Sequence, residues 1–401
     1  MPRPGLRRLR SPRLWAPAGA VLAAGAVTAV ALTAGARPAA PAAADGLPHT
    51  TVEISPGDCG RGWDHPRPGL QVFDLRNSSS RAAEVYLRGA HGGPVHGEVE
   101  GIGPGTTRPL RVRLGAGAYA FTCLPDDANA VTGPVVRVTG GGPAGPAAAP
   151  ITQHDLIGPA LDYQAWVGGG LADLVRRTGA LRAAVAGGDL PAARAAWLPA
   201  HLAYERLGAA YGEFGDADRE INGTTAGLAG GVRDPAFTGF HRVEYGLWHG
   251  EPAAGLRGPA AALDGAVRAL RDSWAQARMD PAALGLRAHE ILENTAQAEL
   301  TGRTDYGSGS NLATARANLD GTRAVLARLR PLLTTRYPQL PELERELDRT
   351  ERLLDGFRRA GRWTPLDRLT RADRQRTNAA VGDLVERLAP VATLCDPRRT
   401  V

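Results

Sequence analysis

The chain has 401 residues, which is long for one domain and sufficient for two, so a sizeable core can form without obligatory disulfides. Its formal net charge is +6, but six arginines and no acidic residue precede Asp45, so the rest of the chain carries no net charge. A neutral remainder offers no stripe of positive charge to neutralise phosphates, which argues against a nucleic-acid-binding protein.

Residues 1–44 have the composition of an export segment. An arginine-rich start is followed by an apolar run over 14–35 and then by small residues such as Ala42, Ala43 and Ala44. The apolar run is long enough to cross a bilayer, so a cleaved signal peptide and an uncleaved signal anchor both remain open. Either form predicts an exported protein, periplasmic or at the cell surface.

The next part of the chain, residues 48–139, has the pattern of strands. Short runs alternate between apolar and polar residues and are separated by Gly, Pro and Asn turns. This pattern predicts a small antiparallel β-sandwich. The expected strands are 50–54, 70–77, 83–89, 107–114, 118–124 and 134–139.

A histidine- and glutamate-containing stretch within this part, residues 90–101, has no clear strand pattern, and a solvated loop is expected there. Its side chains could alternatively hold an ion; they are His91, His96, Glu98 and Glu100. A blue-copper site is disfavoured because such sites use an axial methionine, and the methionines, Met1 and Met279, lie outside the predicted sandwich.

The chain contains three cysteines. Cys59 and Cys123 both fall in the predicted sandwich and are disulfide candidates if the protein is exported, whereas Cys395 is left over. A bridge between the first two would close a long loop and connect the first turn of the sandwich to a late strand.

The rest of the chain is predicted to be helical. Residues 140–150 are rich in Gly and Pro without an apolar pattern, which predicts a linker. From 151 to 395 the apolar period becomes that of amphipathic helices, which predicts an all-α, up-and-down helical bundle. The expected helices are 159–186, 190–211, 238–248, 258–277, 281–300, 311–332, 341–360 and 371–388.

The predicted helix over 238–248 carries a histidine and a glutamate three residues apart, His241 and Glu244. Positions i and i+3 share a face of a helix, so the two side chains can point at one place. Two further predicted helices pair His201 with Glu205 and place His289, Glu290 and Glu293 within one turn.

Helical bundles build metal sites from such inward-facing acids and histidines, and this donor set suits a hard or borderline cation such as iron. Each pair taken alone also fits an ordinary hydrogen bond or surface salt bridge. No HExxH, GxSxG or P-loop motif occurs, so no catalytic function is predicted. A polysaccharide-binding surface protein is poorly supported because only 5% of the residues are aromatic.

Five segments resemble the imelysin-like family in order and spacing: HLAYERLG, EFGDADREING, FTGFHRVEYGLW, AHEILE and NLDGTRAVLARLRPLL. The resemblance covers nearly all of the chain after residue 44, because longer members carry an N-terminal cupredoxin-like domain with two cysteines. The family's GxHxxE signature matches Gly239, His241 and Glu244, and Glu205 falls on a position that the family keeps acidic.

The resemblance implies a function in high-affinity iron uptake outside the cytoplasm. It implies that the helical bundle binds ferrous or ferric iron through the HxxE pair, with copper or another divalent cation as the alternative. It also implies delivery to a membrane iron permease and work beside an exported haem peroxidase. Family members have been labelled peptidases, so an imelysin-type metallopeptidase is the alternative. In the cupredoxin-like part, a Cys59–Cys123 bridge is expected, and Glu84 and Glu98 are the acids of a possible second metal site.

Overall fold

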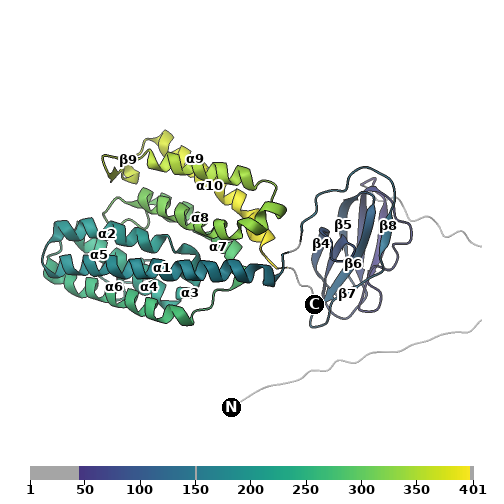
Figure 1. The fold of residues 1–401 in the computed structure, drawn as a ribbon, viewed down its shortest axis with the longest axis horizontal. Helices are drawn as coiled ribbons and strands as arrows, with labels where there is room; N and C mark the ends of the chain where they lie inside the picture. The colour runs from purple at the N-terminus through teal and green to yellow at the C-terminus, as the bar shows by residue number, and fades with distance from the viewer. Residues whose placement is uncertain (1–44, 150, 398–401) are drawn as a thin grey trace, which may run out of the picture. The chain divides into compact units, whose positions relative to one another are not determined.

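The computed structural model describes residues 45–149 and 151–397. The expected export segment, residues 1–44, lies outside this part of the chain. Strands predominate up to residue 138 and helices follow from residue 153, as Figure 1 shows. The predicted change from a strand-rich to a helical part is therefore confirmed. Within the described residues, no helix is long and apolar enough to span a membrane.

The strand-rich part forms two sheets. Its strands are β1 (His49–Ile54), β2 (Gly69–Asn77), β3 (Ala83–Gly89), β4 (Val95–Ile102), β5 (Thr107–Leu114), β6 (Gly117–Pro125), β7 (Val131–Thr132) and β8 (Val136–Val138). One sheet has the order β1-β2-β5, and the other has the order β4-β3-β6-β7 with β8 also paired to β6. All of these pairings are antiparallel except β1 with β2.

The expectation of a fully antiparallel sandwich is therefore wrong for β1. A parallel pair needs a long crossover instead of a tight hairpin, and residues 55–68 supply one. Trp63 in this crossover is buried and packs edge-on against Phe73 and Phe121, with ring centroids 4.9 and 5.5 Å apart. The crossover thus folds onto the core that the two sheets share.

The predicted disulfide between Cys59 and Cys123 is present, with 5.9 Å between the two Cα atoms. It connects the same crossover to β6, which lies in the other sheet. Cys395 is free and buried, and burial raises the pKa of its thiol to about 12. A thiol that stays protonated at neutral pH is a poor nucleophile and a poor metal ligand.

The expectation of a solvated loop over residues 90–101 is wrong for most of that stretch. Residues Val95–Ile102 form β4, which pairs with β3 and places Glu98 directly opposite Tyr86. The strand has few apolar residues because it lies at the edge of its sheet, where polar side chains are tolerated. Its Val95 exchanges two backbone hydrogen bonds with Ala148, so the expected linker also pairs with this edge.

The helical part contains α1 (Gln153–Ala186), α2 (Leu190–Glu205), α3 (Tyr211–Phe214), α4 (Asp216–Asn222), α5 (Gly239–Trp248), α6 (Ala253–Ser273), α7 (Leu284–Gln297), α8 (Asn311–Arg336), α9 (Leu340–Asp355) and α10 (Arg371–Leu394). Short 3₁₀ turns occur among them, including η1 (Gly208–Ala210) and η5 (Glu299–Thr301). Helix α1 packs along α2 and α6, and α7 packs along α8 and α10 (Figure 1). Their apolar faces share one core.

Two features of this part were not predicted. A helix was expected to continue to residue 211, but α2 ends at Glu205, and the chain then folds into η1, α3 and α4. Gly215 separates α3 from α4 with a φ of 58°, a conformation that glycine adopts at little cost. A two-stranded hairpin, Arg358–Arg359 with Arg362–Trp363, replaces the expected C-terminal end of α9. Because α2 and α4 end where they do, Glu205 and Asn222 are each the last residue of a helix.

Candidate metal centre

Helix α5 buries both residues of the HxxE pair. Its apolar residues Phe240, Val243 and Leu247 pack into the core, and the His241 and Glu244 residues are only 2% and 1% exposed. Gly239 begins the helix with a φ of +76°, and a Cβ there would lie 2.2 Å from the carbonyl oxygen of Ile221. The glycine of the signature therefore allows α5 to begin directly against the end of α4.

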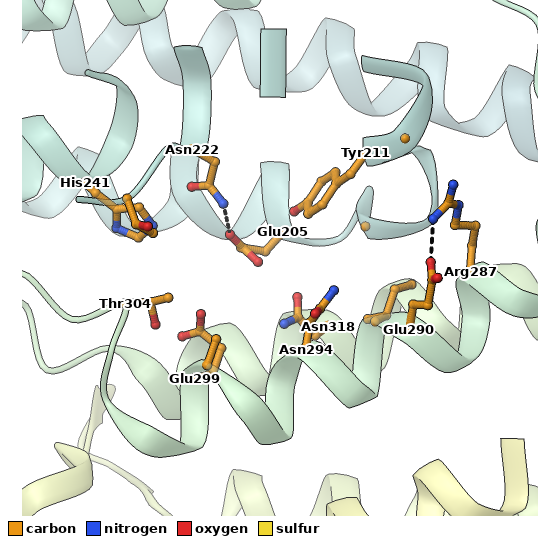
Figure 2. Close-up of a pocket in the computed structure, with 15 residues that line it drawn as sticks. Glu205, Tyr211, Asn222, His241, Arg287, Glu290, Asn294, Glu299, Thr304 and Asn318 are labelled. Carbon is orange, nitrogen blue, oxygen red and sulfur yellow. Dashed lines mark hydrogen bonds and ion pairs between the residues drawn. The ribbon is translucent and has the colours of Figure 1, made fainter. Parts of the chain in front are cut away.

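A cavity of about 200 Å³ lies between the ends of these helices. Figure 2 shows that the carboxylates of Glu205 and Glu299 point toward the same space, with the imidazole of His241 and the hydroxyl of Thr304 beside them. Glu205 comes from the end of α2, His241 from α5 and Glu299 from η5. Three segments distant in sequence therefore contribute oxygen and nitrogen atoms that could bind a cation to one cavity.

The carboxylate of Glu205 is held by polar neighbours. Its Oε1 accepts a hydrogen bond from Nδ2 of Asn222 at 2.7 Å and lies 3.0 Å from Nε2 of His201. Burial disfavours the charged carboxylate, but the neighbouring His201 and its hydrogen bond outweigh burial and lower the pKa of Glu205. Burial likewise opposes protonation of His201, but the charge of Glu205 raises the His201 pKa. Glu205 is therefore ionised and fixed in orientation.

Glu299 differs from Glu205 in the direction in which its pKa is shifted. Burial and the negative charge of Glu205 raise the pKa of Glu299 above its ordinary value. Its Oε2 accepts a hydrogen bond from Nδ2 of Asn311 at 3.1 Å, and that amide also donates to the Thr304 hydroxyl at 3.1 Å. Two buried acids near each other without a neutralising cation are electrostatically unfavourable, and a bound cation would remove that cost.

Glu244 lies behind His241 and does not line the cavity. Its Oε2 is 3.2 Å from Nδ1 of His241, and its Oε1 accepts hydrogen bonds from the backbone N–H groups of Tyr306 and Ser308 at 3.1 Å each. The Ser308 hydroxyl also donates to Oε1. Burial disfavours the charged form, but the hydrogen bond from His241 helps to lower the pKa of Glu244. The carboxylate of Glu244 is thus ionised, and both of its oxygen atoms already have hydrogen-bonding partners.

The other predicted ligands are placed differently. Glu290 lines the cavity, but its carboxylate forms an ion pair with Arg287 at 2.5 Å. The Glu293 side chain is 43% exposed, lies 3.7 Å from the imidazole of His289 and accepts a hydrogen bond from Gln297. The structure therefore brings Glu205 and His241 to the cavity, places Glu244 behind them and leaves Glu293 on the surface.

Sequence reasoning missed Glu299 and Asn222. Glu299 follows the end of α7 and has no histidine within one turn before it, so no short motif marks it. Asn222 lies in the EFGDADREING segment, which was used only for the family resemblance. Asn222 is the last residue of α4 and Glu299 is the first residue of η5, and the ends of such elements are hard to place from periodicity alone.

The acids of the possible second site, Glu84 and Glu98, lie on neighbouring strands of one sheet. Tyr86, which pairs with Glu98, donates a hydrogen bond from its hydroxyl to Glu84. His96 instead packs its ring edge-on against Tyr119, with centroids 5.0 Å apart, and burial lowers its pKa. His91 occupies a turn with a φ of 57°. Across residues 45–149 and 151–397, no group of three or more His, Cys, Asp or Glu side chains is positioned to hold a metal ion as it stands.

These helices and their cavity define the class of protein. The family model described as Imelysin matches residues 160–391, more than half of the chain, so the chain belongs to the imelysin family. The iron uptake system component EfeO of Escherichia coli (strain K12) is 27% identical to it over 348 residues, which cover 86% of this chain and 90% of that protein. The proteins of the same name from Shigella flexneri and Shigella sonnei (strain Ss046) match with the same identity and coverage. The expected family resemblance is thereby confirmed.

Proposed function

We propose that this chain is the iron-binding component of an iron-uptake system and that iron is its cargo. The observation that carries the proposal is the convergence of Glu205, Glu299 and His241 on one buried cavity. Two carboxylates and one imidazole suit Fe²⁺ or Fe³⁺ better than a thiolate-seeking ion. The relatives named as iron uptake system components support the same function.

In this proposal the cation enters between α2, α5 and η5 and competes with protons for the carboxylate of Glu299, whose pKa is raised. The carboxylate and imidazole side chains must move closer together to become ligands, because no metal-holding group is formed among the described residues before binding. Asn222, His201 and Asn311 hold the carboxylates from behind, as outer-layer partners do in metal sites. Glu290 and Glu293 are not needed as ligands.

The cellular setting is part of the proposal. Residues 1–44 would direct export, so the cavity would load iron outside the cytoplasm. The protein would then deliver its cargo to a membrane permease, beside an exported haem peroxidase. The strand-rich part would be cupredoxin-like, with Glu84 and Glu98 as the acids of a second site.

Iron titration of purified protein tests the cavity. Fe²⁺ without oxygen and Fe³⁺ as its citrate complex are titrated into wild type, Glu205→Gln and His241→Ala, with the surface variant Glu293→Gln as control. We expect each cavity variant to bind at least about tenfold more weakly, because removal even of outer-layer partners costs this much in metal sites. Equal affinity in wild type and both cavity variants would overturn the proposal.

The same preparations distinguish transport from peptide hydrolysis. A metallopeptidase needs a general base with access to the metal-bound water, and the four hydrogen bonds on Glu244 leave this carboxylate little freedom for that role. Metal-loaded wild type and Glu244→Ala are incubated with an unfolded protein. We expect no cleavage by either; metal-dependent cleavage by wild type that Glu244→Ala abolishes would favour the peptidase.

A further inference from the structure

One loop segment next to the cavity is held in place by several hydrogen bonds and close contacts. The glycine- and serine-rich segment Thr304–Ser310 links η5 to α8 and turns its backbone N–H groups toward α5. Asp305 organises it, since its Oδ1 accepts hydrogen bonds from the N–H groups of Gly307 and Gly309 at 2.8 and 3.1 Å. We refer to Thr304–Ser310 as the clamp segment.

Close packing holds the clamp segment against α5. Gly307 has a φ of +124°, and a Cβ there would lie 2.7 Å from Cβ of Trp248, so a larger residue would push the segment away. The hydroxyl of Tyr306 accepts a hydrogen bond from the backbone N–H of Thr225 at 2.8 Å, and the Tyr306 ring lies 5.1 Å from the ring of His241. The segment is therefore fixed at both its backbone and its side chains.

Three hydrogen-bond donors of the clamp segment point to one oxygen atom of Glu244. Two backbone N–H groups and the Ser308 hydroxyl converge on Oε1 of Glu244. Three donors on one carboxylate oxygen favour the ionised form of Glu244. Since an ionised carboxylate only accepts hydrogen bonds, a hydrogen bond at its second oxygen, Oε2, needs a donor in the neighbouring group. That neighbour is Nδ1 of His241 at 3.2 Å, and Nδ1 must therefore carry the hydrogen atom.

The placement of this hydrogen decides what His241 offers to the cavity. A neutral imidazole with hydrogen on Nδ1 has its lone pair on Nε2, and only a lone pair can bind a cation. Since Nδ1 faces Glu244 and His241 lines the cavity, Nε2 is the nitrogen left for a cation. We propose that the clamp segment, acting through Glu244, fixes the tautomer and orientation of His241, and that Glu244 and Ser308 are positioning residues and not ligands. This inference rests on the proposed function only for the identity of the cation.

The variant Glu244→Gln gives a sharp test because it keeps the shape of the side chain. The three donors of the clamp segment would hold the amide oxygen at the Oε1 position, which leaves the amide NH₂ facing Nδ1 of His241. Nδ1 would then have to accept, and the hydrogen would move to Nε2. We expect the opposite tautomer in this variant, with iron affinity reduced about 10- to 100-fold.

The tautomer is read by ¹⁵N NMR of the imidazole nitrogens in metal-free protein, so the readout does not depend on iron binding. Ser308→Ala removes one of the three donors and is expected to lie between wild type and Glu244→Gln in affinity. Glu293→Gln is the matched control, since it makes the same chemical change on an exposed side chain. Thermal unfolding of each variant establishes that the fold is retained.

The outcomes separate this inference from the proposed function. Hydrogen on Nδ1 of His241 in wild type and on Nε2 in Glu244→Gln supports the clamp even if wild type binds no iron, in which case only the iron proposal fails. Wild-type tautomer and wild-type affinity in a folded Glu244→Gln variant would overturn the clamp while leaving iron binding intact. Iron affinity lost in Glu244→Gln with the hydrogen still on Nδ1 would instead identify Glu244 as a ligand, which also overturns it.

Discussion

Two buried carboxylates, those of Glu205 and Glu299, face one cavity, and the same environment affects them in opposite directions. His201 keeps Glu205 ionised, and the resulting negative charge, together with burial, raises the pKa of Glu299. A bound cation would favour the ionised form of both acids, so cation binding and proton release are coupled. At the scale of single residues, the protonation of Glu299 is therefore the quantity to measure.

Glu299→Gln is expected to stabilise the metal-free protein at neutral pH. A carboxyl group with a raised pKa contributes its full stability below its unfolded value of 4.5 and loses it as pH rises through the folded pKa. The neutral amide of glutamine does not titrate, so its contribution to stability does not change with pH. The two proteins should therefore have similar free energies of unfolding near pH 4, and these free energies should diverge as pH rises. Urea unfolding of both proteins over a pH series measures this difference; parallel curves at every pH would contradict the assignment.

Iron should reverse this order at neutral pH. A ligand that binds only the folded state at a hundredfold excess over its Kd adds about 2.7 kcal/mol to the free energy of unfolding. Wild type should gain this stabilisation, whereas Glu299→Gln should gain less because one carboxylate is missing. Urea unfolding with and without Fe²⁺ under anaerobic conditions provides the comparison, and an equal gain in both proteins would exclude Glu299 as a ligand.

At the scale of elements, the site depends on where helices begin and end. Glu205 ends α2, Asn222 ends α4, and α5 begins at Gly239 against the backbone of Ile221. The glycine of the GxHxxE signature therefore has a structural reason separate from metal ligation. It allows two helix ends to meet closely enough for Asn222 and His241 to line the same cavity.

Gly239→Ala should destabilise the protein more than Gly250→Ala, although both glycines have a φ of +76°. The shared backbone strain of a left-handed alanine costs about 1–2 kcal/mol. Only at position 239 does the new Cβ also meet backbone atoms, and such overpacking adds about 2 kcal/mol; nothing lies within 4 Å at Gly250. Urea unfolding measures both costs, and iron titration should show weaker binding for Gly239→Ala alone. Equal effects of the two variants would refute the close-contact argument.

At the scale of the whole molecule, the described residues contain two large hydrophobic cores with no residue in common, one in the sheets and one among the helices. The disulfide belongs entirely to the first core, where it closes a loop of 64 residues in sequence between Cys59 and Cys123. The proposed iron cavity is lined only by residues of the helical part of the chain. Stability of the sheets and iron affinity are therefore expected to vary independently.

Replacement of both Cys59 and Cys123 by alanine should destabilise the strand-rich part by about 4 kcal/mol, the cost expected for reopening a loop of this length. The unfolding of the helices and the iron affinity should remain as in wild type. Differential scanning calorimetry and iron titration test this, with Cys395→Ala as a control that removes a thiol without removing a crosslink. A single transition that shifts as a whole would show that the two parts unfold together.

The sequence by itself determined the features that depend on local periodicity. Alternation over two residues and over a helical turn separated the strands from the helices, and helical spacing paired His241 with Glu244 and His201 with Glu205. The disulfide was also predicted, because Cys59 and Cys123 are the two cysteines of the strand-rich part and an exported protein can form disulfides. The periodic relations hold between residues close in sequence, so they need no knowledge of packing, and the cysteine pair was found from composition and not from geometry.

Only the tertiary structure decided which side of each element faces the cavity. Glu293 and Glu299 are six positions apart, yet the first is exposed and the second is buried beside Glu205, because the chain leaves α7 before it reaches Glu299. The hydrogen bonds from Ser308 to Glu244 likewise join two residues that are 64 positions apart in sequence. Periodicity indicates which residues share a face, but packing between distant segments determines what that face meets.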